Sequence, residues 1–548
     1  MGEKEEYVAQ GGNAYDNQEA ASVQGQTTEY NLANSHDQLE RGLKSRHIQF
    51  LALGGAIGTG LFIGSGAILA RTGPAPLFMA YLSMMALVWV IMNVLAEMVT
   101  YLPMRGITVP YFTGRFVDPS LAFAAGWNYW YAYAMLVGAE AVAAGIIIDY
   151  WQPPVSIGLW IAIVLVVMLL LNIIAVSFFG EAEFWFASIK LITICGLIMV
   201  SIVLFFGGGP DQTGVRGFHY WKDPGAFVEF KAKGSTGKFL SYWSAFISAG
   251  FAFITSPELI AISAGETVAP RRNIPKAARR FIYRLAIFYG VSSLLIGTMV
   301  PSNDKKLLGA SDASASPFVI GIQNAGIPIL NHIINGAVLT SAWSAGNSFL
   351  YSGSRVLYSM ALNNQAPKWF RITNKRGVPW VAVLFTWAFG LLAFLNVSNS
   401  GATVFNWFVN ISTISGFIAW IVVMITYLRF RKAMVFNNML ESLPYRTPLQ
   451  PYATWFVLLI ITILTLTNGF AIFTHGSWDT KSFIAAYITI PIFLVLYLGH
   501  KLWFRTPLCI PVQNIDVITG KREMDELEAM DVPPVARNWL EKIWFWLA

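Results

Sequence analysis

Charged residues are scarce in this sequence. Aspartate, glutamate, lysine and arginine make up only 12% of its 548 residues, whereas a soluble globular domain carries about 25%. Hydrophobic residues reach 55%, and the mean hydropathy is +0.54. This composition excludes an ordinary soluble protein and indicates a polytopic membrane protein.

Residues that hold metals or build disulfides are equally scarce. The two cysteines, Cys195 in an apolar segment and Cys509 near the C-terminus, cannot form a disulfide framework. The six histidines are scattered without ligand spacing. No nucleophile elbow or phosphate loop occurs, and the GxGxxG-like fragment at 58–66 follows no strand. We therefore expect no enzyme, no metal and no cofactor, and the net charge of +7 gives no reason to expect nucleic acid.

Long apolar runs fill most of the chain. The sequence predicts an all-α membrane protein with about twelve transmembrane helices. The expected spans are 48–70, 76–100, 119–149, 155–177, 184–206, 240–263, 281–301, 327–360, 379–396, 402–428, 452–472 and 482–503.

Two tails flank this expected transmembrane domain, which covers 43–505. Residues 1–42 are polar and are expected to form a disordered cytoplasmic tail, and residues 506–548 a cytoplasmic C-terminal tail. With both termini inside, the cytoplasmic connections hold about fifteen lysines and arginines against about nine outside, as the positive-inside rule requires.

Two of the expected spans are interrupted in their middles. The first contains GGAIGTGLFIGSG at 54–66, and the sixth contains Ser256-Pro257. These spans are equivalent if the core consists of two five-helix repeats of opposite topology, and paired interruptions indicate a transporter's binding site. The alternative is close helix packing through small residues such as Gly60 and Gly64 at four-residue spacing, and we interpret Gly64 and Gly66 as packing residues.

A few polar side chains fall inside the spans. Glu140 lies in span three, Lys190 in span five and Glu258 in span six. A carboxylate in low dielectric is unfavourable unless it is protonated or paired, so these residues are candidates for proton coupling. The alternatives are structural pairs across helices and, for Lys190, a side chain that reaches the cytoplasmic interface.

Span eight carries a polar stripe. Its members recur on one helical face, which should point to a cavity or a partner helix rather than to lipid. They are Ser344, Asn347, Ser348 and Tyr351.

Several longer motifs resemble those of the fungal amino acid permeases in the amino acid/polyamine/organocation superfamily. They are LKSRHIQFLALGGAIGTGLFIGSG at 43–66, FGEAEFWFASIK at 179–190, AGETVAPRRNIPKAARRFIYR at 264–284, SAGNSFLYSGSRVLYSMA at 344–361, QAPKWF at 365–370 and FNWFVNISTISGFIAW at 405–420. This resemblance implies a five-plus-five inverted-repeat core with discontinuous helices 1 and 6. It also implies proton-coupled import of amino acids at the plasma membrane, with the lipid bilayer and cytoplasmic trafficking machinery as further partners.

The resemblance also implies a site. Backbone amides of the broken first helix would meet the substrate carboxylate, Phe253 would be an aromatic gate, and Trp343 a pocket wall. The expected substrate-binding residues are Ala56, Ile57, Gly58, Thr59, Gly60, Glu140, Phe253, Thr255, Ser256, Trp343 and Asn347. The expected proton-coupling residues are Glu140, Lys190 and Glu258.

The substrate is less closely defined by the motifs. Ser256-Pro257-Glu258, with WNYWYAYAML at 127–136, is similar to the branch of filamentous-fungal proline permeases, so proline is the first candidate. Proline-specific members carry a lysine near Ser248 and an aromatic at Thr255, where this chain has small polar residues. Other neutral or charged amino acids, a polyamine, or a non-transporting sensor function remain alternatives.

Overall fold

The computed structural model describes residues 58–103, 108–174, 176–254, 256–258, 269–308, 316–327, 329–474, 476–529 and 538–539. Of the expected site residues, Ala56, Ile57 and Thr255 lie outside these ranges, as does the expected tail at 1–42. The described residues belong to one compact unit, 39–548.

The secondary structure of the described residues is helical, as predicted. Within the described ranges, eight helical segments are long and apolar enough to cross a membrane, and a ninth candidate is a pair bent by 44°. The eight comprise α4 (Pro74–Tyr101), α6 (Pro119–Asp149), α7 (Ile157–Ile174), α8 (Val176–Phe205), α9 (Gly234–Phe253), α11 (Pro270–Leu285) continued by η3 (Ala286–Val291) and α12 (Ser292–Met299), α16 (Trp380–Gly390) continued by η6 (Leu391–Val397), and α17 (Gly401–Phe436). The bent pair is α19 (Thr480–Tyr487) with α20 (Thr489–Phe504).

The three other expected spans also coincide with helices. Span one is described from η1 (Gly60–Gly64) through α3 (Ser65–Thr72), and span eleven is α18 (Tyr452–Leu466). Span eight is α15 (Leu330–Leu362), which is long enough but carries the polar stripe and so lacks a sufficiently apolar window. Shorter helices include α5 (Val109–Phe116), η2 (Trp221–Gly225), α13 (Lys305–Leu308), α14 (Pro317–Gln323) and α21 (Lys521–Ala529).

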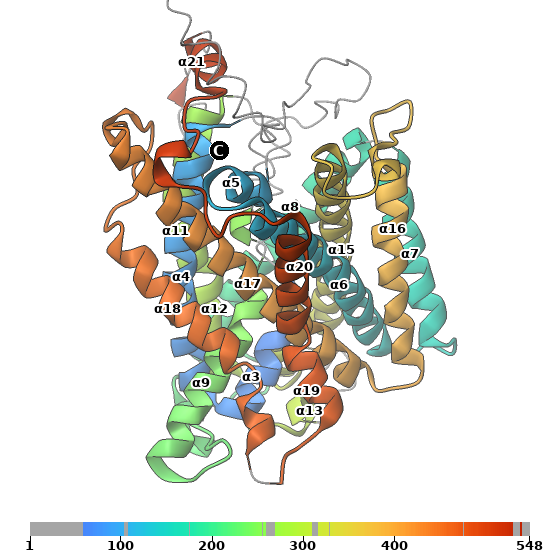
Figure 1. Ribbon diagram of the computed structural model, residues 1–548. Coiled ribbons are helices and arrows are strands. Elements are labelled where there is room, and N and C mark those ends of the chain that lie inside the picture. Colours follow the sequence, from blue (N-terminus) through green and yellow to red (C-terminus); the bar gives the residue numbers. More distant parts are fainter. Residues whose placement is uncertain are drawn as a thin grey trace, which may run out of the picture. The chain divides into compact units, whose positions relative to one another are not determined.

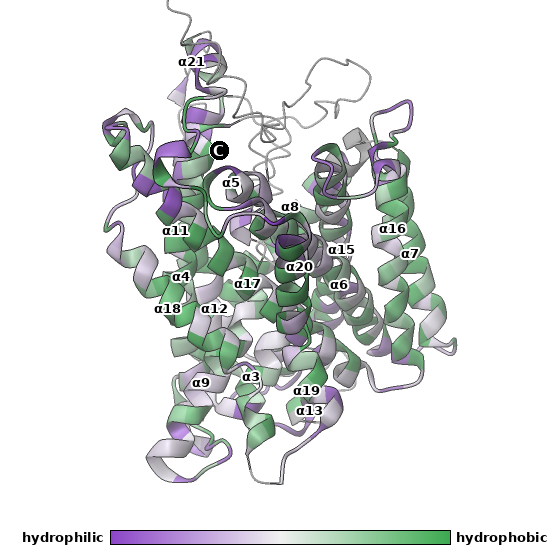
Figure 2. Cartoon of the chain, viewed as in Figure 1, coloured by the Kyte–Doolittle hydropathy of each residue, from purple (hydrophilic) through white to green (hydrophobic). Residues whose placement is uncertain are grey.

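Burial separates central helices from those that face lipid. In α6, 94% of the most apolar window is buried inside the protein, against 28% in α7. The exposed residues of α7 include Leu159, Ile163, Val166 and Leu170, which form an apolar stripe at helical spacing. Hydrophobic residues predominate along the long helices, and hydrophilic ones gather near the ends and loops (Figure 2).

Helix α6 is fixed at its start by a cap and an ion pair. Asp118 adopts an extended conformation, and its carboxylate accepts hydrogen bonds from the backbone N–H groups of Ser120 and Leu121. Pro119 at the first helical position loses no hydrogen bond there. The Lys501 ammonium of α20 lies 2.7 Å from the same carboxylate, so span twelve is tied to the central helix.

The chain after α20 packs against the helices. Arg115 of α5 donates to the carbonyl oxygens of Asp516 and Thr519 at 2.7 and 2.8 Å, and it pairs with the Asp516 carboxylate at 3.1 Å. Arg271 of α11 contacts the Asp525 carboxylate of α21 at 2.6 Å. Helices α5 and α21 lie at the end of the helical bundle opposite α3, α9 and α19 (Figure 1).

Candidate functional site

The described part of span one begins at a bend, and span six is interrupted near its middle. Gly58 forms a bend outside the helix, and its carbonyl oxygen accepts the first backbone bonds, from Leu61 and Phe62 at 3.2 and 3.4 Å. Helix α9 ends at Phe253 because Ile254 has an extended backbone, with φ −56° and ψ 146°, and helical geometry returns at 256–258. The predicted interruption of span six is thus confirmed, whereas the chain before Gly58 in span one lies outside the described residues.

The two interruptions touch each other through Gly60. A Cβ atom added to Gly60 would lie 2.6 Å from the Cα atom of Ala252, so only glycine permits this approach. By contrast, a Cβ added to Gly64 would meet only the Thr59 carbonyl oxygen at 3.9 Å, an ordinary contact. The interpretation of Gly64 as the close-packing residue is therefore wrong, and the tight contact lies four residues earlier.

Two tyrosines hold the backbone on either side of this contact. Tyr81 of α4 donates to the Gly60 carbonyl oxygen at 3.2 Å, and Tyr289 of η3 donates to the Ala252 carbonyl oxygen at 3.0 Å. The ring of Phe253 packs against both tyrosine rings, at centroid distances of 5.7 and 4.5 Å. Phe253 is fully buried in this arrangement, so its expected role as a gate requires it to leave these rings.

Glu140 of α6 points at the broken end of span one. The Thr59 hydroxyl donates to Glu140 Oε1 at 2.8 Å, and both side chains are buried. Glu140 Oε2 has no hydrogen-bond partner among the described residues. Helix α15 passes close by, since a Cβ on Gly346 would lie 3.2 Å from the Glu140 Cβ. The structure thus brings together Thr59 and Glu140, two of the expected site residues.

Lys190 adds a cation beside this pair, together with a carboxylate that the sequence analysis missed. The Lys190 side chain is 1% exposed and interacts electrostatically with Glu183 and with Glu140. Glu183 is also buried, and its two carboxylate oxygens each accept a hydrogen bond from the Ser344 hydroxyl at 2.9 Å. The alternative that Lys190 reaches the interface is wrong, because its side chain is buried.

Other members of the polar stripe in α15 also point to neighbouring helices. The Asn172 amide of α7 donates to Asn347 Oδ1 at 2.7 Å. Trp343 is partly exposed and stacks on Phe186 of α8, at a centroid distance of 6.3 Å. Its indole N–H has no partner among the described residues.

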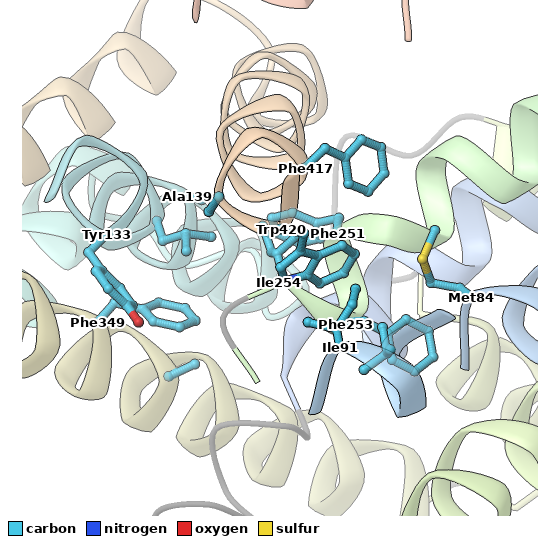
Figure 3. Close-up of a cluster of buried hydrophobic side chains, with 14 of the residues drawn as sticks. Met84, Ile91, Tyr133, Ala139, Phe251, Phe253, Ile254, Phe349, Phe417 and Trp420 are labelled. Atoms are coloured by element: carbon cyan, nitrogen blue, oxygen red, sulfur yellow. The ribbon is translucent and has the colours of Figure 1, made fainter. Parts of the chain in front are cut away.

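Glu258 lies in different surroundings. It is 2% exposed and lies beside Tyr129 of α6 and Trp420 of α17. The Tyr129 hydroxyl and the Trp420 indole N–H are the hydrogen-bond donors nearest to the Glu258 carboxylate among the groups that affect it. Trp420 belongs to the buried cluster that also holds Phe251 and Ile254 at the interruption of span six (Figure 3). Ser256, two residues nearer the interruption, is buried as well.

Comparison with known proteins agrees with this architecture. The family model for amino acid permeases matches residues 47–509. A proline-specific permease of Emericella nidulans is 57% identical over 517 residues, covering 93% of this chain and 94% of the relative. A probable proline-specific permease of Schizosaccharomyces pombe is 56% identical, covering 90% of each chain. The dicarboxylic amino acid permease of Saccharomyces cerevisiae is 39% identical, covering 90% of this chain and 82% of the relative.

A solved structure shows the same fold. The crystal structure of a manganese transporter from Eremococcus coleocola matches with a TM-score of 0.55 at 15% identity, covering 86% of this chain and 95% of that one. The expected all-helical transporter fold, the resemblance to fungal permeases and the expectation of a transporter rather than an enzyme are confirmed. The chain belongs to the amino acid permease family.

Proposed function

We propose that this permease imports an amino acid together with a proton across the plasma membrane, and that L-proline is the first substrate to test. The names of the proline-specific relatives support the substrate. The observation that carries the proposal is the buried contact between Thr59 and Glu140 at the broken end of span one.

The broken end of span one suits a carboxylate. The first N–H groups of a helix have no intrahelical acceptor and lie at the positive end of the helix dipole. The first hydrogen bonds of η1 come from Leu61 and Phe62, so the amides of Gly58, Thr59 and Gly60 precede them. These amides would bind the substrate carboxylate, with Ala56 and Ile57 completing the segment. Phe253, Thr255, Ser256, Trp343 and Asn347 would form the remaining walls.

Glu140 has the properties expected of a proton carrier. An ionised carboxylate is costly in a buried site unless it is paired, whereas the protonated form can donate through its second oxygen. Lys190 lies near enough to stabilise the ionised form after the proton has left. Proton binding from outside would then accompany substrate binding, and proton release inside would leave the pair between Glu140 and Lys190. Glu258 would be a second carboxyl group in the proton pathway.

We place both termini in the cytoplasm, in accordance with the basic connections between spans. In this orientation the segment bound by Arg115 and Arg271 lies on the cytoplasmic face. The tails at 1–42 and 506–548 are then accessible to the trafficking machinery. The half of span one that begins at Gly60 faces outward, so substrate would approach the broken spans from outside.

Transport by the purified protein in proteoliposomes tests the proposal. Labelled L-proline should accumulate under an inward proton gradient and should not accumulate when the gradient is dissipated. Competition by each common amino acid then defines the specificity. Binding without flux would favour a sensor, uptake of a polyamine alone would change the cargo, and absence of both accumulation and binding would refute the proposal.

Glu140→Gln separates proton coupling from folding. Glutamine keeps an oxygen that can accept the Thr59 hydrogen bond, but it cannot carry a proton. We expect gradient-driven accumulation to be lost while the amount of protein at the cell surface stays near that of the wild type. Wild-type uptake kinetics and pH dependence in this variant would remove Glu140 from the coupling site.

A further inference from the structure

A cavity lined by both polar and apolar residues lies between α3, α9, α17 and α19. Helices α3, α9 and α19 lie at one end of the bundle (Figure 1). The volume of the cavity is about 180 Å³. A water molecule needs about 10–15 Å³ of such space, so the cavity has room for a small organic molecule. It is lined by residues of α3, α9, α17 and α19 and of the loops that follow α18 and η2. In the orientation proposed above, it lies on the outer side.

Arg71 supplies the charge of this cavity. It stands in the last turn of α3, and it is the single ionisable side chain among the described residues that line the space. Its Nη2 donates to the Ser248 hydroxyl at 2.7 Å, and its guanidinium lies 5.9 Å from the centre of the Phe230 ring. These contacts orient the group without neutralising it. Arg71 has no carboxylate partner among the described residues.

Neutral hydrogen-bonding groups share the space with this cation. Asn410 and Thr413 of α17 line the cavity, as does Asn468 after α18. Thr413 is 2% exposed, and its hydroxyl has no partner among the described residues. The cavity thus offers one guanidinium without a carboxylate partner among the described residues, together with uncharged polar groups. This arrangement suits a ligand that has a single carboxylate and no other negative charge.

The floor of the cavity separates it from the interruption of span six. A Cβ on Gly250 would lie 2.5 Å from the Phe417 ring, and one on Gly416 would lie 2.4 Å from the Ile254 side chain, so α9 and α17 are tightly packed below the cavity. Phe417 and Ile254 both belong to the buried cluster in Figure 3. Ser248 precedes Ile254 by six residues, which is about 9 Å along a helix. Ser248, which lines the cavity, is therefore about two helical turns from the interruption.

We propose that the cavity lined by Arg71 is an entry site that binds the carboxylate of an incoming neutral amino acid before the molecule reaches the broken spans. The inference rests on the proposed function. Arg71 holds the carboxylate through the N–H groups that Ser248 does not use, and Thr413 offers a hydroxyl to the same ligand. Passage onward requires α9 and α17 to separate at Phe417 and Ile254.

Uptake kinetics of Arg71→Gln test the entry site. We expect the KM for the best-transported neutral amino acid to rise about tenfold or more, because a hydrogen bond to a charged group is lost, with little change in the maximal rate per molecule at the surface. Lys231→Gln is the matched control. Lys231 also lies 5.9 Å from the Phe230 ring, but it bonds to Ser477 and does not line the cavity. Its KM should stay at the wild-type value.

A second readout separates carboxylate binding from a general structural role. Inhibition by the amino acid is compared with inhibition by its amide, which lacks the carboxylate. The preference for the acid should fall in Arg71→Gln and persist in Arg71→Lys, which retains the charge. Equal KM values and equal preferences in Arg71→Gln and Lys231→Gln overturn the entry site.

The outcomes distinguish this inference from the proposed function. If the wild type transports no amino acid, the proposed function fails first. If the Arg71→Gln protein does not reach the cell surface, the same kinetics are measured on Thr413→Val, because this substitution keeps the shape and charge of the cavity. A KM raised several-fold in Thr413→Val supports the site, and an unchanged KM overturns it.

Discussion

Replacing Gly60 by alanine tests whether spans one and six are held together at their interruptions. The added Cβ would lie 2.6 Å from the Cα and 2.9 Å from the Cβ of Ala252. Carbon atoms attract one another best at about 3.5–4.0 Å, so the two segments must separate by about 1 Å. The nearer atom is backbone and cannot rotate away. The two carbonyl groups bound by Tyr81 and Tyr289 must therefore move as well.

Two opposing effects set the size of the change. Overpacking of a well-packed interior costs about 1–3 kcal/mol. Alanine in a helix is about 1 kcal/mol more favourable than glycine, which partly offsets this cost at Gly60. Because the obstacle is backbone, we expect the upper part of the range and a net destabilisation of about 2 kcal/mol. At Gly64, in the same helical turn, there is room for a Cβ, so alanine should be neutral or stabilising.

The assay is thermal inactivation of the purified permease in detergent, followed by the fraction that stays monodisperse. Unfolding of a membrane protein of this size is often irreversible, so rates at one temperature are compared as well as midpoints. Gly60→Ala should inactivate faster than the wild type, and Gly64→Ala should not. Ala252→Gly should rescue Gly60→Ala only in part, because the Cα atom remains. Equal stability of the Gly60 and Gly64 variants would refute the contact.

Two further predictions concern a single hydrogen bond and a single ion pair. Tyr289→Phe leaves the Ala252 carbonyl oxygen without its donor, at a cost of about 1–3 kcal/mol, and should lower the inactivation temperature while leaving the aromatic contacts in place. In α21, the pKa of Asp525 is lowered from its ordinary value of 3.8. The largest cause is a hydrogen bond from Lys521, and the Arg271 guanidinium also contributes. The ionised carboxylate therefore stabilises α21 above pH 3.8, and this contribution is lost as the pH falls through the lowered value. The rate at which a protease releases α21 should be constant from about pH 5 to 8 and should increase at lower pH. Asp525→Asn should increase this rate at neutral pH. A rate that changes neither with pH nor with the substitution contradicts the ion pair.

Periodicity and composition predicted the fold because the bilayer imposes a strict length on every span. The expected spans coincide with helices in the described part of the chain, and span six is interrupted where Ser256-Pro257 indicated. These features depend on local chemistry, namely backbone hydrogen bonds that glycine and proline fail to complete.

The missed features depend on contacts between distant segments. Glu183 lies seven residues before Lys190, which places both on one face of α8, but the sequence does not show that Ser344 of α15 meets that face. Gly60 and Gly64 are alike in sequence, and only the position of Ala252 distinguishes them. The bonds from Tyr81 and Tyr289 also required the packed structure, since each joins one span to another.

Those two tyrosine bonds have a consequence for the transport cycle. In a five-plus-five repeat, spans one and two correspond to spans six and seven, and each pair is joined by one such bond, from Tyr81 to Gly60 and from Tyr289 to Ala252. Their rings lie 6.1 Å apart and share the Phe253 ring between them. A conformational change that preserves both links moves the four spans as one rigid body, and the displacement occurs against α6 and α15.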